Sequence, residues 1–422
     1  MISIDRIRNN FEEIKSGLLS KGYTDDLGEI ISIDKDYRHG LHRVNELRAE
    51  RNKVSDEIAE LKKTKQNANE KIILMRTVGQ KIKNLESSLA EQKENLNNLI
   101  LNLPNIPNSS VPKGSSEVEN KIISEWGNEN IKSFDLKTHI DLGSSLKLFD
   151  FERSAKLSGS GFPLYTGKGA LIERSLINFM IEFQTQKNDY LEIIPPFLVN
   201  SNSVLTTGNL PKFSDDMYHS EIDNLWLIPT AEVPLTNIHC NEILNESDLP
   251  KKYAAYSACF RREAGSYGKD TKGLKRLHQF NKVELVQLVK PEESYEALES
   301  LTLHAEMVLQ ALNLKYRKIE LCTGDLSFSA AKCYDLEIWA PAEEKWLEVS
   351  SCSNFEDFQS RRGNIRFRKE DDNKVDFVHT LNGSGLATPR LLIALLETYQ
   401  NADGTVTVPE ILQDYAKLKI ID

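Results

Sequence analysis

The stretch FRREAGSYGKDTKGLKRLHQFNKVELVQ places cationic, aromatic and acidic side chains on two apparent strands joined by a loop. Because side chains alternate along a strand, we expect Arg261 and Glu263 to share one face and Arg262 to point the other way. Phe280, Lys282 and Glu284 should share a face of the return strand. Guanidinium groups bind phosphoryl oxygens, aromatic planes stack on purines and carboxylates accept from amino or hydroxyl groups. The pattern favours a site for a phosphorylated nucleotide beside a small polar molecule.

Glu284 lies within an apolar run, KVELVQLV, so we expect its side chain to be buried. An unpaired charge is costly to bury, and the simpler interpretation, an exposed hairpin with incidental surface charge, does not explain its position. We therefore expect a ligand to pair with this carboxylate. The intervening GSYGKDTKGLKR is cationic and interrupted by glycines, as expected of a lid over phosphate or an RNA terminus.

Two further stretches combine polar side chains with a constrained backbone. LIPTAEVPLTN places Thr230 and Glu232 on one face after a strand, flanked by prolines. LNGSGLATPR places Asn382 and Ser384 between glycines, where a ligand can approach the backbone closely, and ends with Arg390 at a helix start. Each motif is weak alone, since Thr-Ala-Glu is more often ordinary loop chemistry. Together with the hairpin they indicate one site.

The elements that must position these side chains begin at about residue 156, where strand-like stretches alternate with helices. Helical periodicity predicts helices over 172–183, 293–312 and 389–399. YLEIIPPFLV is typical of a strand whose tandem prolines lie at a strand end or sheet edge. Neither G-x-G-x-x-G after a strand nor G-x-x-x-x-G-K-[ST] occurs, which excludes Rossmann and P-loop nucleotide sites. An ATP site would have to use arginines on strands.

The N-terminal part has a different pattern. Apolar residues recur at alternating spacings of three and four over 44–61 and 75–99, on either side of the polar KKTKQNANEK. This predicts an antiparallel coiled-coil hairpin. Residues 41–103 carry 12 Lys and Arg against 9 Asp and Glu, in a chain with net charge −10. The hairpin could be a solvated spacer or oligomerisation device, or an arm laid on a phosphate backbone; the pattern leaves both open.

Composition places the chain among globular proteins. Its 422 residues suggest two or three domains, with 40% hydrophobic and 27% charged residues. The five cysteines form no CxxC pair and no zinc spacing, which favours a reducing cytoplasm. The apolar stretches are too short to span a membrane, and the N-terminus resembles neither a signal nor a transit peptide. We expect a cytoplasmic protein without a membrane partner.

These motifs give the chain a family resemblance that covers its whole length. KNDYLEIIPPFLVN resembles motif 1 of the class II aminoacyl-tRNA synthetases, with Pro196 at the motif's proline. FRREAGS…RLHQFNKVEL resembles motif 2 and GSGLATPRLLIALLE resembles motif 3. The long hairpin and LIPTAEVPLTN resemble the bacterial-type seryl-tRNA synthetases in particular. The resemblance implies an α+β fold: an antiparallel catalytic sheet with flanking helices, a coiled-coil hairpin, and a homodimer with motif 1 at its interface.

The resemblance also implies a two-step reaction. L-serine attacks the α-phosphate of ATP, giving seryl-adenylate and diphosphate, and the seryl group then moves to the 3′ end of serine tRNA. ATP is a substrate and Mg²⁺ its companion ion. Whether selenocysteine tRNA is also charged is left open. Because the protein does little covalent chemistry in such a reaction, positioning and charge stabilisation carry the rate.

For the nucleotide, the resemblance implies that Arg261 binds the α-phosphate and the substrate carboxylate, and that Arg390 binds the γ-phosphate. Glu263 and Phe280 would hold the adenine, Phe280 by stacking, and Arg276 would belong to the mobile motif 2 loop. Of these, the catalytic residues would be Arg261, Glu263 and Arg390. The full ATP-binding set implied by the resemblance is Arg261, Arg262, Glu263, Arg276, Phe280, Glu348, Val349, Ser350, Ser351 and Arg390.

For the amino acid, the resemblance implies that Thr230 and Glu232 bind the α-amino group. It implies that Glu284, with Asn382 and Ser384 nearby, binds the substrate hydroxyl. Alanine should then be rejected strongly, because Glu284 would be left desolvated and unpaired. The full serine-binding set implied by the resemblance is Thr230, Ala231, Glu232, Arg261, Glu284, Asn382 and Ser384.

A metal site follows from the family pattern in WLEVSSCSN, which makes Glu348 and Ser351 ligands of a phosphate-bound Mg²⁺. Residues three apart point to opposite faces of a regular strand. We therefore predict a bulge or strand end between Glu348 and Ser351.

Domain boundaries and departures from the family pattern complete the picture. We expect a tRNA-binding hairpin arm over 1–110, a linker and connecting segment over 111–155, and the catalytic domain over 156–422.

Two residues depart from the family pattern: Asp189 stands where motif 1 usually has glycine, and Arg262 replaces a small residue. Two alternatives are a ligase that loads a carrier protein, which should lack the arm, and a non-catalytic coiled-coil RNA-binding paralogue. A paralogue of that kind should have lost residues such as Arg261 or Glu284.

Overall fold

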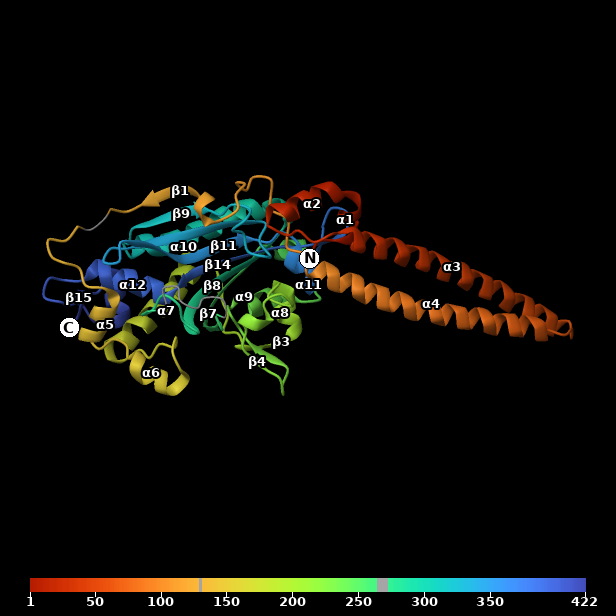
Figure 1. Cartoon of the computed structure of the whole chain (residues 1–422), viewed down its shortest axis with the longest axis horizontal. Coiled ribbons are helices and arrows are strands. Elements are labelled where there is room, and N and C mark those ends of the chain that lie inside the picture. The colour runs from red at the N-terminus through yellow and green to blue at the C-terminus, as the bar shows by residue number, and fades with distance from the viewer. Residues whose placement is uncertain (129–130, 264–271) are drawn as a thin grey trace. The chain divides into compact units, whose positions relative to one another are not determined.

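The computed structural model describes residues 1–128, 131–263 and 272–422 (Figure 1). The chain forms two compact units, one of residues 2–19 and 23–104 and another of residues 1, 20–22 and 105–422. Most of the lid expected in GSYGKDTKGLKR lies outside the described residues, because 264–271 are not described. None of the helices in the described ranges is both long and apolar enough to cross a membrane.

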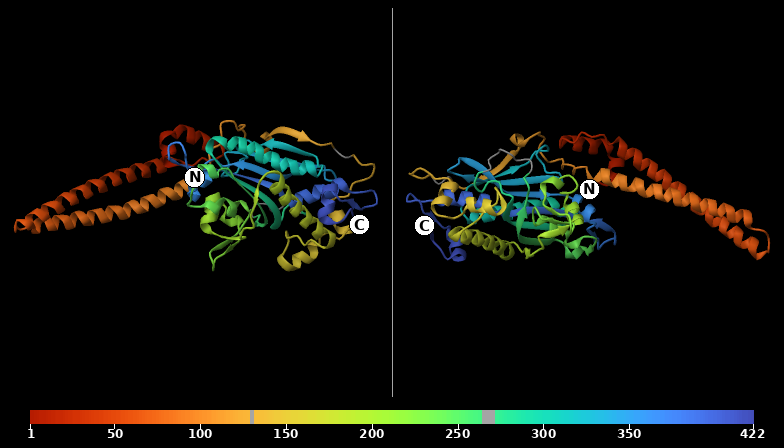
Figure 2. Two further views of the ribbon diagram at one scale, coloured as in Figure 1. Left: turned by 180° about the vertical axis from the view of Figure 1, so that it is seen from behind. Right: turned by 60° about the horizontal axis from the view of Figure 1, so that its bottom comes forward.

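The N-terminal unit is built around a helical hairpin. The apolar seam predicted from the spacing is buried between the two long helices: Val44 and Leu47 pack with Val78, Ile82 and Leu89. Two views show the long helices running side by side (Figure 2). The predicted antiparallel coiled coil is confirmed. The helices of this unit are α1 (Ile4–Asn9), α2 (Phe11–Ser20), α3 (Gly28–Lys63) and α4 (Asn69–Leu101).

Helix α3 begins earlier than the apolar pattern indicated. It starts at Gly28, and its buried residues before Val44 include a polar one, Asp34. Arg8 Nη2 donates to Asp34 at 2.8 Å and Arg38 Nε donates at 3.0 Å, so the carboxylate is fully paired. Gly40 allows the close approach of α4, since a Cβ there would lie 2.7 Å from Leu89 Cδ2. An acidic residue thus occupies a buried position of α3 that periodicity alone would assign to an apolar one.

The second unit centres on an eight-stranded sheet, in the order β1-β9-β10-β11-β14-β8-β7-β2. All neighbouring pairs are antiparallel except β2 and β7, which are parallel. The segment 111–155, expected as a linker, supplies the edge strand β1 of this sheet. The strands are β1 (Lys121–Trp126), β2 (Leu191–Glu192), β7 (Lys251–Phe260), β8 (Gln279–Val289), β9 (Tyr316–Glu320), β10 (Lys332–Ala340), β11 (Lys345–Asn354) and β14 (His379–Ala387).

Three helices share the main hydrophobic core with this sheet: α7 (Gly167–Lys187), α10 (Ser294–Ala311) and α12 (Thr388–Tyr399). They coincide with the three predicted helices. Val283 and Leu285 of β8 point into this core, whereas Val286 packs with Ala231 and Leu235 in a separate cluster. Alternation along β8 therefore assigns Glu284 to the face opposite the helices.

Smaller elements surround the sheet. Asp189, where the family pattern has glycine, adopts φ 58°, a left-handed conformation that glycine and Asp tolerate better than bulky residues. The remaining helices are α5 (His139–Ser145), α6 (Phe151–Ser158), α8 (Ser201–Thr207), α9 (Glu232–Thr236), α11 (Phe358–Gly363) and α13 (Glu410–Ala416), with 3₁₀ turns at Glu117–Glu119, Ser214–Asp216, Asn237–His239, Glu246–Asp248 and Pro291–Glu293. The remaining strands are β3 (Leu198–Asn200), β4 (His219–Ser220), β5 (Leu225–Leu227), β6 (Ile243–Asn245), β12 (Arg366–Arg368), β13 (Val375–Phe377), β15 (Val406–Thr407) and β16 (Ile420–Ile421).

Candidate active site

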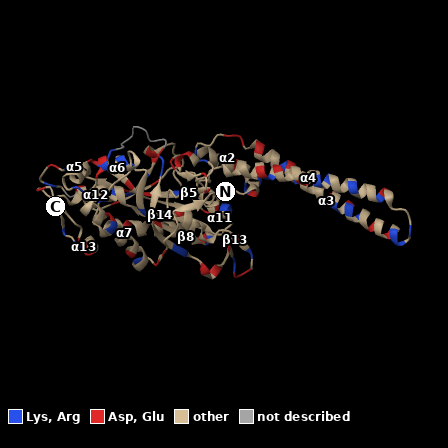
Figure 3. Cartoon of the chain, turned by 90° about the horizontal axis from the view of Figure 1, so that it is seen from below, with Lys and Arg blue, Asp and Glu red and all other residues tan. Residues whose placement is uncertain are grey.

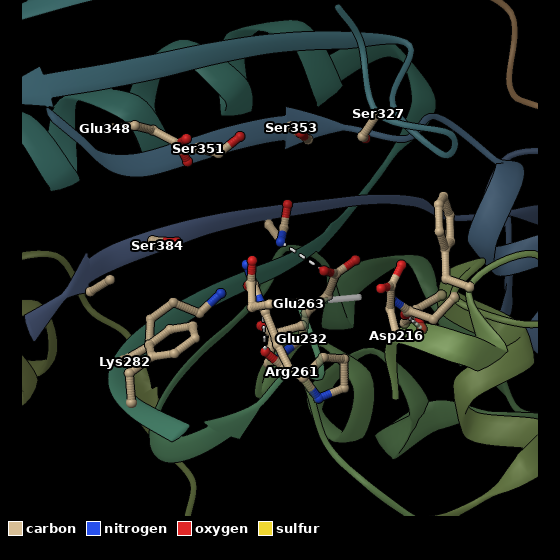
Figure 4. A pocket seen from close by; sticks show the side chains of 18 of the residues that line it. Asp216, Glu232, Arg261, Glu263, Lys282, Ser327, Glu348, Ser351, Ser353 and Ser384 are labelled. Atoms are coloured by element: carbon tan, nitrogen blue, oxygen red, sulfur yellow. Dashed lines mark hydrogen bonds between the residues drawn. The ribbon is translucent and has the colours of Figure 1, made fainter. Parts of the chain in front are cut away.

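A cavity of about 790 Å³ opens between the sheet and the segments around α8 and α9. It brings together side chains from the motif 2 hairpin and from the stretches LIPTAEVPLTN, WLEVSSCSN and LNGSGLATPR, and several point toward one another (Figure 4). The predicted site residues that line it are Thr230, Glu232, Arg261, Glu263, Arg276, Phe280, Glu348, Val349, Ser351, Asn382, Ser384 and Arg390.

Four predicted site residues do not line the cavity. Ala231 is fully buried in the cluster with Leu235, and Ser350 is 1% exposed, with its hydroxyl donating to the Ser384 carbonyl at 2.7 Å. Arg262 is exposed outside the cavity. Glu284 lies beneath the cavity surface, fully buried, and reaches the lining side chains through hydrogen bonds.

Glu284 is the centre of a buried polar network. Thr230 Oγ1 donates to Glu284 Oε2 at 2.7 Å, and Asn382 Nδ2 donates to Glu284 Oε1 at 3.2 Å. Lys282 forms an ion pair with Glu284 Oε2. The expectation that Glu284 stays unpaired without a ligand is therefore wrong. The sequence placed Lys282 on the same strand face as Glu284, but Lys282 was not assigned a role at the site.

Glu232 is the second carboxylate of this network. It accepts from Gln359 Nε2 at 2.7 Å and from Asn382 Nδ2 at 2.9 Å, so Asn382 bridges the two carboxylates. Burial, and then the neighbouring charge of Glu284, raise the pKa of Glu232 to about 7. Gln359, on α11, had no signal in the sequence. A cationic group bound here would favour the ionised form of Glu232.

The motif 2 side chains lie together in the cavity, but the alternation of side chains along a regular strand is not what places them there. β7 ends at Phe260, and Glu263 adopts φ 51°, a left-handed conformation that ends any regular alternation. Arg276 Nη1 donates to Glu263 Oε2 at 3.2 Å. The Arg261 guanidinium lies 5.1 Å from the Phe280 ring centroid. The shared location of Arg261 and Glu263 is as predicted, but the alternation expected to produce it is absent.

The predicted bulge between Glu348 and Ser351 is present. Along the pair of β10 and β11, Leu336 faces Ser350 and Glu337 faces Glu348, so Val349 is left without a partner. This extra residue turns Glu348 and Ser351 toward the same cavity. Both offer oxygen atoms, which suit a hard cation such as Mg²⁺.

The charges around this bulge also favour a cation. Asp335 lies opposite Ser351 on β10, and its pKa is raised well above the usual value, first by burial and then by the Glu348 carboxylate. Arg390 Nη1 donates to the Glu348 carbonyl at 2.8 Å, so a guanidinium already lies beside these acids. The arrangement can hold a cation and the phosphate groups that accompany it.

Comparisons with known proteins agree with this geometry. Residues 213–399 match the family model of the tRNA synthetase class II core domain (G, H, P, S and T). The fold and the site thus define a class II aminoacyl-tRNA synthetase. Residues 1–107 match the seryl-tRNA synthetase N-terminal domain. The chain belongs to the seryl-tRNA synthetase family, as full-length relatives also show.

Two curated relatives are each called serine--tRNA ligase. That of Chlorobium phaeobacteroides is 50% identical over 427 residues, covering 100% of this chain and 99% of its own, and that of Listeria welshimeri is 52% identical over 98% and 97%. Among solved structures, seryl-tRNA synthetase from Pyrococcus horikoshii complexed with ATP is 39% identical, with a TM-score of 0.94 over 100% and 99% of the two chains. The predicted family and fold class are confirmed.

Proposed function

We propose that this enzyme activates L-serine with ATP and transfers the seryl group to the 3′ end of serine tRNA. The observation that carries the proposal is one cavity with a buried carboxylate network at one end and a set of arginines at the other. Family membership supports the same reaction, since the relatives are serine--tRNA ligases and one solved homologue is complexed with ATP.

The amino-acid end would bind serine through its two polar groups. The α-amino group would lie between Glu232 and Thr230, where the ammonium would keep Glu232 ionised. The hydroxyl would join the network around Glu284, whose Oε1 accepts from Asn382 and can accept one further donor. Ser384 lines the same wall of the cavity.

The nucleotide end would hold ATP largely through charge. Arg261 would contact the α-phosphate and serine carboxylate, and Arg390 the γ-phosphate, while Phe280 and Glu263 take the adenine. Arg276 reaches the same region through its contact with Glu263. Glu348 and Ser351 would hold Mg²⁺, which supplies positive charge against the phosphates.

In this arrangement the serine carboxylate oxygen attacks the α-phosphorus, and the bond to the diphosphate breaks. A ribose hydroxyl of the tRNA terminus then attacks the serine carbonyl, and AMP leaves. The protein forms no covalent bond in either step. Its arginines stabilise the charge that develops on the phosphoryl oxygens, and the network around Glu284 fixes the serine.

The N-terminal hairpin would bind the tRNA. Lys and Arg residues occur along α3 and α4 and near their connecting turn, as the blue ribbon segments show (Figure 3). Two exposed apolar side chains at the edge of the second unit support a homodimer: Leu191 of β2 is 61% exposed, and Ile194, shortly after it, is 85% exposed.

We place the enzyme in the cytoplasm, which agrees with its five unpaired cysteines.

Serine-dependent exchange of diphosphate into ATP tests the first step. The full chain should exchange with serine, and alanine should be slower by about 10²-fold rather than more, because Glu284 keeps its three protein partners when the hydroxyl is missing. Equal rates with the two amino acids would refute the assignment.

Removal of the hairpin tip, residues 52–80, should spare exchange and abolish tRNA charging. Loss of both would contradict the role of the arm.

A further inference from the structure

A buried cluster of side chains outside the cavity contacts the segment that links the motif 2 loop to β8. Residues 273–276 of this segment carry two groups that reach the nucleotide end. Arg276 contacts Glu263 at 3.2 Å, and the Lys275 carbonyl accepts from Arg390 Nε at 3.3 Å. Whatever fixes this segment therefore also fixes two of the three arginines that face the nucleotide.

His139 makes the central contact. Its side chain is fully buried at the start of α5, and its Nε2 accepts from the Leu274 N–H at 3.3 Å. Because Nε2 is the acceptor, the ring proton lies on Nδ1. Nδ1 faces two carboxylates, Glu343 at 3.2 Å and Glu397 at 3.4 Å. One imidazole thus joins the loop backbone to two acidic side chains.

The two carboxylates are themselves anchored. Glu397 Oε1 accepts from the backbone N–H of His139 and Oε2 from that of Ala342, both at 3.0 Å. Glu343 Oε2 pairs with Lys275 Nζ at 2.5 Å, which adds a second tie to the same loop segment. The cluster connects α5, α12 and the turn between β10 and β11 to the loop.

The packing leaves little freedom for movement. Gly273 adopts φ 71°, and a Cβ built there would lie 2.2 Å from His139 Nε2. Leu274 is 1% exposed. The backbone of the segment therefore lies directly against the imidazole.

We propose that His139 is a positioning residue for ATP: by accepting from Leu274 it holds the segment 273–276, and through it Arg276 and Arg390, in the geometry that receives the phosphates. The inference rests on the proposed function, because it assigns the nucleotide to this end of the cavity. It predicts that loss of the His139 acceptor affects the handling of ATP and spares the serine subsite.

A metal centre is the competing interpretation of the same side chains. Ligand atoms of His139, Glu343 and Glu397 lie within 4.8 Å of one another. However, Nε2 faces an N–H group, and oxygens of both carboxylates accept from Lys275 or from backbone N–H groups. These contacts favour a hydrogen-bonded cluster over a metal centre, and the experiment below distinguishes these two interpretations.

The test compares two amides at one position in the full-length protein. His139→Gln places its amide where Nε2 lies and can still accept from Leu274. His139→Asn places its amide where Nδ1 lies and can face the two carboxylates without reaching Leu274. Binding of ATP by calorimetry, the KM for ATP and for serine in diphosphate exchange, and thermal unfolding are measured for both.

We expect His139→Asn to weaken ATP binding and raise the KM for ATP about tenfold, the size of one buried hydrogen bond. The KM for serine should stay within about twofold, and His139→Gln should retain most of the ATP affinity. If His139→Asn does not fold, Glu343→Gln provides the second test. It releases Lys275 while keeping the shape of the side chain, and should raise the KM for ATP about threefold.

Equal ATP affinities for the Asn and Gln variants would overturn the proposal, as would equal changes in the KM values for ATP and serine. Loss of ATP binding by the unsubstituted protein on treatment with a chelator, restored by Zn²⁺ alone, would instead establish the metal centre. Calorimetry keeps this inference separate from the proposed function, because ATP binding without serine-dependent exchange would count against serine activation only.

Discussion

At the amino-acid end of the cavity, Glu284 is fully buried and held by three protein side chains, whereas at the nucleotide end Arg261 is exposed and, among the residues that the structure describes, donates to the Pro229 carbonyl at 3.4 Å. Arg390 likewise contacts backbone carbonyls and the exposed Glu348. The first end is complete before any ligand arrives. The second holds its cations with weak partners that phosphates can replace. Selectivity and charge stabilisation are thus assigned to differently built parts of one cavity.

The largest effect is expected from removing charge at the nucleotide end. Arg261→Ala should lower the rate of serine-dependent exchange by about 10³-fold, because the proposed function assigns its guanidinium to the reacting α-phosphate. Thermal stability should change little, since Arg261 is exposed and makes no ion pair among those described. Arg262→Ala is the matched control, an arginine one residue along that lies outside the cavity. Similar losses for the two variants would contradict the assignment.

Breaking the buried pair at the amino-acid end should reduce both activity and stability. Glu284→Gln leaves the buried Lys282 ammonium without its counter-charge, so we expect a loss of about 3 kcal/mol in the free energy of unfolding and about 10²-fold in exchange. Urea unfolding and initial exchange rates measure the two effects. Adding Lys282→Met to Glu284→Gln should restore stability without restoring exchange. A double variant as unstable as the single one would show that the pair is not the cause.

The pH dependence of serine binding should follow Glu232. Its pKa of about 7 is above the ordinary range, so the carboxyl is largely protonated in the free enzyme below pH 7. Serine binding needs the ionised form, and kcat/KM for serine should rise about fivefold from pH 6 to pH 7, about twofold more to pH 8, and level off above. Glu232→Gln should remove this dependence. A profile unchanged by that substitution would exclude Glu232 as the titrating group.

The same raised pKa has a consequence for stability. Because the folded state binds the Glu232 proton more tightly than the unfolded state, its contribution is present at low pH and is lost as the pH rises through 7. Relative to the parent, Glu232→Gln should therefore gain stability between pH 5 and pH 8. Thermal unfolding across this range provides the check.

The smallest effect is expected at the mouth of the nucleotide end. Arg276 is 39% exposed and pairs with Glu263, so its contribution is screened by solvent. Arg276→Gln should raise the KM for ATP by about threefold and leave the KM for serine unchanged. The difference should shrink at high salt, as expected for an exposed charge. A larger effect on serine than on ATP would contradict the division of the cavity.

Much of this arrangement could be predicted from the sequence, and the failures have identifiable physical causes. The hairpin and the three core helices followed from periodicity. The bulge at Val349 followed from requiring Glu348 and Ser351 to face one cavity, a geometric constraint that one strand can satisfy only by an extra residue. The hairpin and helices needed only the local pattern, whereas the bulge also needed the family resemblance that assigns Glu348 and Ser351 to one metal site.

The errors arose where distant segments decide the outcome. Lys282 neutralises Glu284, and Gln359 arrives at Glu232 from α11, more than 120 residues later in the chain. Strand β1 pairs with β9, about 190 residues later in the chain, and no motif in the sequence indicated this pairing. Periodicity and motif spacing describe neighbours in sequence, and these contacts join residues that are neighbours only after folding.

The unpaired Val349 has one more consequence, for the kind of change that β11 can tolerate. Deletion of Val349 would leave Leu336 opposite Ser350 and Glu337 opposite Glu348 in a regular ladder, and Glu348 and Ser351, then two residues apart, would still share a face. Ser350 would keep its place across from Leu336, and its hydroxyl could still support the Ser384 carbonyl. A residue inserted within 350–354 would instead exchange the inward and outward orientations of the residues beyond it, so loss of the bulge residue should be tolerated better than such an insertion.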